Sequence, residues 1–211
     1  MKKFILLLLL TRVSLITTAQ NSDTSNNKNE IGTLLFGIKN NLGQVNPMQP
    51  SFFNGIDYKR YLGKSAIRVR IDYRNNYWKE GAELETTNNY KETGIRTGFQ
   101  RMFGNKIIKL YLASDIILVK IISQSEIYPG AWLNPYEKQY LKYLGVGLAP
   151  SLGLNFKLSN TLSLSIESNY EIILVNKQGT KTVNNKATEI NSKEFVYRIN
   201  PINIFSLNYK F

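Results

Sequence analysis

The connections between the candidate strands constrain this chain most, because tight turns alternate with long polar stretches. The tight turns are Leu62-Gly63-Lys64-Ser65, Phe103-Gly104-Asn105-Lys106 and Leu158-Ser159-Asn160-Thr161, and the long polar connections cover residues 40–50, 76–88, 123–137 and 176–194. Three short and four long connections join eight strands. With an even number of strands, both chain ends lie on the short-turn side. The sequence therefore predicts an all-β, eight-stranded, antiparallel up-and-down barrel with two unlike ends.

Several candidate strands alternate strictly between apolar and polar residues, which is typical of half-buried β-structure. The clearest cases are residues 67–74, 144–156 and 162–172. Their apolar faces hold Ile67, Val69, Ile71, Tyr73, Leu144, Val146, Leu148, Leu152, Leu154, Phe156, Leu162, Leu164, Ile166, Tyr170 and Ile172. The remaining strands are centred on residues 34–38, 56–61, 95–103, 108–118 and 197–211, with less regular alternation.

Alternation does not say which face meets lipid, because a lipocalin-like soluble barrel has the same period with the faces reversed. The polar faces combine Gly, Ala and Ser with long charged side chains, which suits a narrow lumen. Aromatic residues also gather near both strand ends, as in the girdles of membrane barrels. They are Tyr61, Phe103, Phe156, Tyr209 and Phe211 at the short-turn end, and Tyr77, Trp78, Tyr128, Trp132, Tyr136, Tyr140 and Tyr197 at the other. These features favour lipid outside and charge inside.

The N-terminus has the three parts of a secretory signal peptide. Met1-Lys2-Lys3 is basic, residues 4–10 are apolar, and small residues precede an expected cleavage after Ala19 or Gln20. We expect a signal peptide over 1–20, a polar lead-in over 21–29 and the barrel domain over 30–211. Removal of the signal would lower the formal charge from +12 to about +9. A basic exported protein favours anionic partners such as lipid headgroups, and nucleic acid is not expected.

The charged residues of the expected lumen form the main candidate site, as a structural network of ion pairs. Buried charges are tolerated when they are paired and hydrogen-bonded. The candidates are Asp57, Lys59, Arg68, Arg70, Asp72, Arg74, Glu92, Arg96, Lys109, Asp115, Glu167, Glu171 and Arg198. An eight-stranded barrel has an interior just wide enough for side chains, so a general porin channel is not expected.

Catalysis has little support in this sequence. The chain contains no cysteine and no histidine, which excludes thiolate chemistry and leaves Ser163 or Ser165 without an imidazole base. Paired carboxylates such as Asp57 with Asp72, or Glu167 with Glu171, could do acid–base work, but nothing in the sequence sets their separation. No cofactor motif is present. We expect a protein that is not an enzyme and has no cofactor or metal.

The last strand ends in apolar residues at alternate positions, Phe205, Leu207, Tyr209 and Phe211. This pattern resembles the C-terminal signal that barrel-assembly machinery reads in Gram-negative outer-membrane proteins. Residues 30–211 resemble the small OmpA/OmpX-type barrels, and more particularly the exported barrel domains called PorT-like. The resemblance implies a transmembrane barrel in the cell outer membrane, with short periplasmic turns and long extracellular loops. Members of such families share a fold and little function.

The functional expectation is a structural or loop-mediated binding role in the outer membrane. Expected partners are outer-membrane lipid and lipopolysaccharide, the barrel-assembly machinery, and an extracellular protein bound through the loops. Basic residues of the 176–194 connection, such as Lys177 and Lys186, are the best placed for such contacts. Two alternatives remain open at this point: a component of a secretion or transport assembly, which the PorT-like resemblance implies, and a secreted soluble barrel that binds an apolar ligand.

Overall fold

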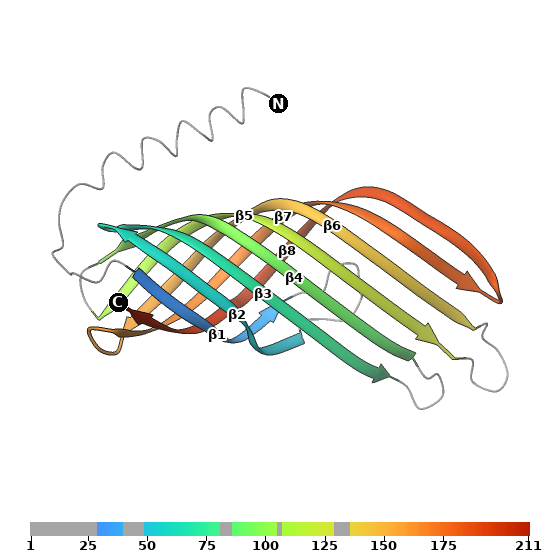
Figure 1. Ribbon diagram of the computed structural model, residues 1–211, viewed down its shortest axis with the longest axis horizontal. Helices are drawn as coiled ribbons and strands as arrows, with labels where there is room; N and C mark the ends of the chain where they lie inside the picture. The colour runs from blue at the N-terminus through green and yellow to red at the C-terminus, as the bar shows by residue number, and fades with distance from the viewer. Residues whose placement is uncertain (1–28, 40–48, 81–85, 105–106, 129–135) are drawn as a thin grey trace, which may run out of the picture.

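Eight antiparallel strands close into one barrel in the computed structural model, which describes residues 29–39, 49–80, 86–104, 107–128 and 136–211 (Figure 1). Each strand pairs with the next in the chain, and β1 pairs with β8 to complete the ring. The strands are β1 Asn29–Lys39, β2 Gln49–Leu62, β3 Ser65–Glu80, β4 Thr86–Phe103, β5 Ile108–Ile127, β6 Glu137–Lys157, β7 Leu162–Val183 and β8 Lys186–Lys210. The expected fold class is confirmed.

The first and third tight turns lie where the sequence predicted them, and the second falls partly on residues 105–106, which lie outside the described residues. Leu62 pairs with Ser65 across Gly63 and Lys64, and Gly63 has a φ of 67°. A positive φ is strained for residues with a side chain and costs glycine nothing, so this position suits a two-residue hairpin. Gly104, which directly follows β4, likewise has a φ of 90°. Ser159 Oγ accepts a hydrogen bond from the Leu162 amide at 3.0 Å in the third turn.

Strand length rises steadily around the barrel, from 11 residues in β1 to 25 in β8. The last described pairing of β1 with β8 joins Ile38 to Ile202, whereas β7 and β8 stay paired up to Val183 and Lys186. The end opposite the tight turns is therefore oblique, and the β7–β8 hairpin extends beyond the shorter strands (Figure 1).

The prediction of a long loop over residues 176–194 is wrong. Strands β7 and β8 continue through this segment and are joined by a turn at Asn184 and Asn185, whose φ angles are 47° and 64°. Two consecutive positive φ angles define the turn that best matches strand twist, and asparagine tolerates them. The connection over 76–88 is also shorter than predicted, because β3 runs to Glu80 and β4 begins at Thr86. The connection predicted over 123–137 is shorter too, because β5 continues to Ile127. Polar strands lack the apolar alternation on which the prediction rested.

The two faces of the wall are sorted by polarity. Ile71 is 54% exposed on the outside of β3, while its neighbours Arg70 and Asp72 are 2% and 4% exposed in the lumen. The outer apolar positions of β5 run from Ile108 to Leu118, ten residues apart. At about 3.3 Å per residue and a tilt of about 40°, they form a band about 25 Å tall, the height expected for a bilayer-facing belt.

Small residues inside the barrel make room for large ones. A Cβ built on Gly153 of β6 would overlap the Tyr111 ring of β5, and one built on Gly98 of β4 would overlap the Asp115 carboxylate. Both glycines lie on the inward face, where they permit a close approach. The sequence-based reason for expecting a narrow lumen therefore has a direct structural basis.

The lumen is not polar throughout, contrary to expectation. An apolar cluster fills it toward the oblique end, formed by Tyr90, Ile117, Val119, Ile121, Leu141, Tyr143, Ala149, Ile173 and Val175. Trp78 packs against this cluster, and Tyr61 bonds Glu30 near the turns, so neither belongs to an outer aromatic girdle. The central segment of β5 is apolar on both faces, and alternation cannot reveal the inward half of such a strand.

The signal peptide, most of the polar lead-in, residues 40–48 and Trp132 lie outside the described residues. Asn29, assigned to the lead-in, begins β1. Among the described residues, no helix is long and apolar enough to cross a membrane.

Substitution of Gly153 by alanine tests the tight packing of the lumen. The added methyl forces the Tyr111 ring to move, and we expect a loss of unfolding free energy of about 1–3 kcal/mol. Urea unfolding of the vesicle-inserted barrel, followed by tryptophan fluorescence, measures it. The double variant Gly153→Ala/Tyr111→Leu should lose less than the sum of the single variants, because the clash is removed. Simple additivity would contradict the close approach.

Candidate functional site: a layered charge network in the barrel lumen

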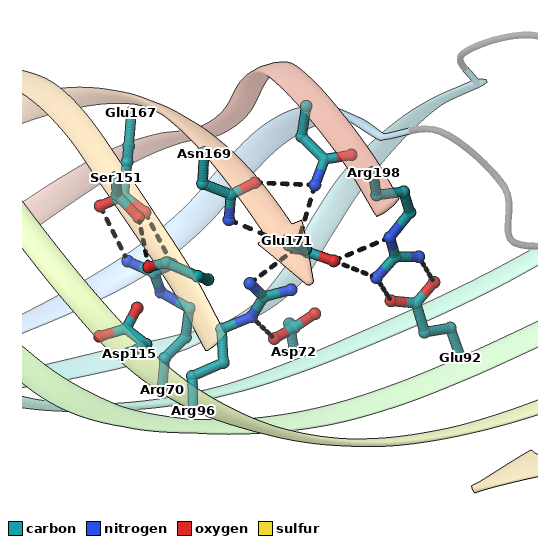
Figure 2. A network of polar contacts seen from close by, with 12 residues as sticks. Arg70, Asp72, Glu92, Arg96, Asp115, Ser151, Glu167, Asn169, Glu171 and Arg198 are labelled. Atoms are coloured by element: carbon teal, nitrogen blue, oxygen red, sulfur yellow. Dashed lines mark hydrogen bonds and ion pairs between the residues drawn. The ribbon is translucent and has the colours of Figure 1, made fainter. Parts of the chain in front are cut away.

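The inward face of β7 shows how the lumen is layered. Ser163 and Ser165 lie nearest the tight turns, Glu167 and Glu171 follow, and Ile173 continues into the apolar cluster. The charged layers therefore lie between a small polar layer and an apolar one. Two clusters of ion pairs occupy them, which we call the turn-side cluster and the loop-side cluster; Figure 2 shows residues of both.

The turn-side cluster contains seven charged residues, each at most 2% exposed. They are Glu30, Asp57, Lys59, Arg68, Arg70, Asp115 and Glu167. Lys59 Nζ lies 2.8 Å from Glu30 and 3.1 Å from Asp57. Arg70 lies 3.8 Å from Asp57 and 3.1 Å from Glu167. The contacts form one chain of alternating charge that links β1, β2, β3 and β7.

Arg68 is the centre of this cluster. Its Nε and Nη2 atoms donate to the two Asp115 oxygens at 2.8 and 2.6 Å, and its Nη1 donates to Glu167 at 2.5 Å. Such two-pronged contacts with a carboxylate are the strongest ion pairs available to arginine. Tyr111 Oη donates to Glu167 at 3.1 Å, so two arginines and a tyrosine bind this carboxylate. Arg68 connects β3 with β5 and β7 across the lumen.

The loop-side cluster contains Asp72, Arg74, Glu92, Arg96, Glu171 and Arg198. Arg96 lies 3.1 Å from Asp72 and 2.8 Å from Glu171. Arg198 donates to both Glu92 oxygens at 3.1 Å and also pairs with Glu171 (Figure 2). Arg74 and Tyr90 add bonds to Glu92 at 2.8 and 2.9 Å. Asn200 donates to Glu171 and to Asn169, at 3.0 and 2.7 Å.

The charges in each cluster nearly cancel. Three arginines face three carboxylates in the loop-side cluster. The turn-side cluster holds three cations and four carboxylates, and Lys210 lies 3.8 Å from Glu30 at its rim. An uncompensated charge at this depth would be strongly unfavourable, so this balance is what a closed lumen requires.

Twelve of the thirteen charged residues named from the sequence are buried in these two clusters. Lys109 is the exception: it is half-buried near the turns and makes no ion pair with the described residues. The sequence analysis missed Glu30, which is fully buried beside Lys59. Glu30 alternates with the apolar Ile31, and this pattern could have placed Glu30 on the inward face of the first strand. It also missed Tyr90 and Tyr111, whose hydroxyl groups each bond a buried carboxylate.

The arrangement offers little for acid–base chemistry. Glu167 is bound by two arginines and Glu171 by another two, so neither carboxylate is available to take a proton from a substrate. Within the described part of the chain, no group of three Asp or Glu side chains is placed to hold a metal ion. The geometry supports a structural role for the network.

The C-terminal apolar residues face outward at the end of β8 and at Phe211, which directly follows it. Leu207, Tyr209 and Phe211 are 38%, 51% and 51% exposed, and the Tyr209 and Phe211 rings stack at 6.3 Å. The segment pairs with β1 on one side and β7 on the other, which closes the barrel.

No protein-family model matches this chain, and no curated protein matches its sequence. Among solved structures it is similar to Ail, the attachment invasion locus protein of Yersinia pestis, with 11% identity over 89% of this chain and 100% of that one, and a TM-score of 0.44. It is also similar to the outer membrane protein W of E. coli, with 9% identity over 90% of this chain and 100% of that one, and a TM-score of 0.44. Similarity at this level concerns the barrel fold alone.

Removing one partner of the Arg68–Asp115 pair tests the network. Asp115→Leu leaves Arg68 with Glu167 and Arg70 nearby, and we expect a loss of about 3–5 kcal/mol in unfolding free energy. The double variant Arg68→Met/Asp115→Leu removes both charges, and its loss of unfolding free energy should be smaller than that of Asp115→Leu alone. Urea titration of the inserted barrel measures both variants. A double variant that is less stable than the single one would contradict the account.

Proposed function

We propose that this protein is a small outer-membrane β-barrel whose role is structural or binding, without catalysis. The observation that carries the proposal is the sorting of its wall, with an apolar belt outside and paired charges inside. A soluble barrel would hide the apolar face and expose the charged one. The secreted ligand-binding alternative needs that reversed arrangement, and we do not favour it.

The proposed orientation places the tight turns in the periplasm and the oblique end outside the cell, as in bacterial barrels of this architecture. The outward apolar residues from Phe205 to Phe211, at the C-terminal end of the chain, then act as the signal for the barrel-assembly machinery. Affiliation with OmpA/OmpX-type or PorT-like barrels remains part of this proposal. The alternative of a secretion or transport assembly has no specific support in the geometry of the described residues.

The proposed binding surface is the polar sheet of β6, β7 and β8 beyond the apolar belt, in place of the long polar loop expected over 176–194. Lys181 pairs with Glu137 at 2.8 Å, and Lys138 with Glu126 at 2.6 Å. Hydrogen bonds from Lys138 and Tyr128 hold the pKa of Glu126 below its ordinary value. A paired sheet presents such side chains at fixed spacing, which lowers the ordering cost of binding a partner.

A charge placed in the apolar belt tests the membrane location. Ile71→Arg should lower the stability of the inserted barrel by about 2–4 kcal/mol, because the guanidinium would face hydrocarbon. Gln124→Arg is the matched control, since Gln124 is exposed on the outside of β5 beyond the belt. It should cost no more than about 1 kcal/mol. Folding into lipid vesicles measures both, and equal effects would contradict the assigned lipid face.

Single cysteines test the orientation, because the chain has no cysteine of its own. Ala187→Cys, next to the β7–β8 turn, should react with a membrane-impermeant maleimide on intact cells. Ser159→Cys, in a tight turn at the opposite end, should react only after lysis. The reverse pattern would show that the barrel is inserted the other way round.

A further inference from the structure

A groove of about 690 Å³ lies on the outside of the barrel wall across β4 to β8. Ile95, Leu118, Val146 and Leu174 line it, and each is at least 40% exposed, so the groove is on the outer face. Its size is within the range of ligand-binding clefts. On the side of the groove away from the tight turns, its lining residues are polar: Thr93, Lys120, Asn176 and Lys193. The groove therefore joins an apolar floor to a basic, hydrogen-bonding rim.

The basic rim follows from the strand register. Lys120 of β5, Leu144 of β6, Asn176 of β7 and Lys193 of β8 are direct neighbours in one row. Three strand spacings separate the two lysines, a distance of about 14 Å between backbones. In the next row, Lys91 of β4 and Lys142 of β6 lie on either side of Ile122. Four lysines therefore lie at the edge of the apolar belt, where the outward side chains become polar.

These lysines have no acidic neighbours in the two rows. Lys91, Lys120, Lys142 and Lys193 form no ion pair with any side chain that the structure describes. The carboxylates of the lumen lie on the opposite face of the wall, bound to arginines. A concentration of uncompensated cations beside an exposed apolar floor is complementary to a ligand that joins phosphate to acyl chains.

We propose that this groove binds the lipid A part of lipopolysaccharide, with acyl chains on the apolar floor and phosphates at the lysine rim. The proposal rests on the proposed membrane location, which puts the groove at the edge of the outer leaflet. Lipid A is a disaccharide with phosphate at its ends and several acyl chains, and two lysines about 14 Å apart along one edge of an apolar floor suit that shape. Bound lipid would then cover the side of the barrel from β4 to β8.

Native mass spectrometry of the refolded full-length barrel tests the proposal, with lipid A, dephosphorylated lipid A and phosphatidylcholine as probes. We expect lipid A to bind at least tenfold more tightly than either other lipid. Lys120→Gln/Lys193→Gln should abolish that preference. Lys64→Gln/Lys157→Gln, which removes two exposed lysines near the tight turns, should retain it. Equal binding of the three lipids by the unmodified protein, or an unchanged preference in the Lys120/Lys193 variant, would overturn the proposal.

Insertion of each variant into phosphatidylcholine vesicles is measured first. An unmodified protein that fails to insert would count against the proposed membrane function itself. A protein that inserts but shows no preference for lipid A would refute only the groove assignment. Val146→Trp, which fills the floor and leaves the lysines in place, gives a second readout. It should weaken lipid A binding at least tenfold, and unchanged binding would contradict the use of the floor.

Discussion

The pairing of arginine with carboxylate inside a closed wall is the interaction on which the rest of this structure depends. An eight-stranded barrel has no room for a solvated lumen, so each inward charge must find its partner among the other inward side chains. Arg68 joins β3 to β5 and β7, and Arg198 joins β8 to β4 and β7. Apart from Arg198 with Glu171, which are direct partners on β8 and β7, these contacts cross the lumen between strands that are not neighbours. They therefore fix the cross-section of the barrel, which wall hydrogen bonds alone would leave free to flatten.

The filling of the lumen and the polarity of the outer face both change along the barrel axis. Paired charges fill the barrel behind the apolar belt, and the apolar cluster around Ile117 and Ile173 continues the filling toward the oblique end. Beyond it β7 and β8 still pair with each other, with mostly polar side chains up to the turn at Asn184 and Asn185. The paired strands β7 and β8 therefore extend beyond the apolar belt as a largely polar sheet. The exterior groove lies at the boundary between the belt and this sheet.

The sequence predicted the parts of this fold in which the chemistry alternates. Arg68, Arg70 and Asp72 were assigned to the lumen because Ile67, Val69 and Ile71 alternate with them, and the tight turns were visible from Gly63 and Gly104. The β7–β8 hairpin was missed because polar strands have the composition of a loop. The inward cluster around Ile117 was missed because β5 is apolar on both faces there. Neither Arg68 with Asp115 nor Lys120 with Lys193 could be brought together without the strand register, which composition does not encode.

The most direct test of the central claim, a charge-filled barrel that lies in lipid, is fractionation of expressing cells followed by gel electrophoresis of unheated and boiled samples. A closed barrel has no free edge strand at which detergent-driven unfolding can begin, so it should stay folded in detergent until it is heated. The account predicts recovery in the outer-membrane fraction and a mobility that changes on boiling. Recovery as a soluble exported protein with one mobility at both temperatures would contradict it.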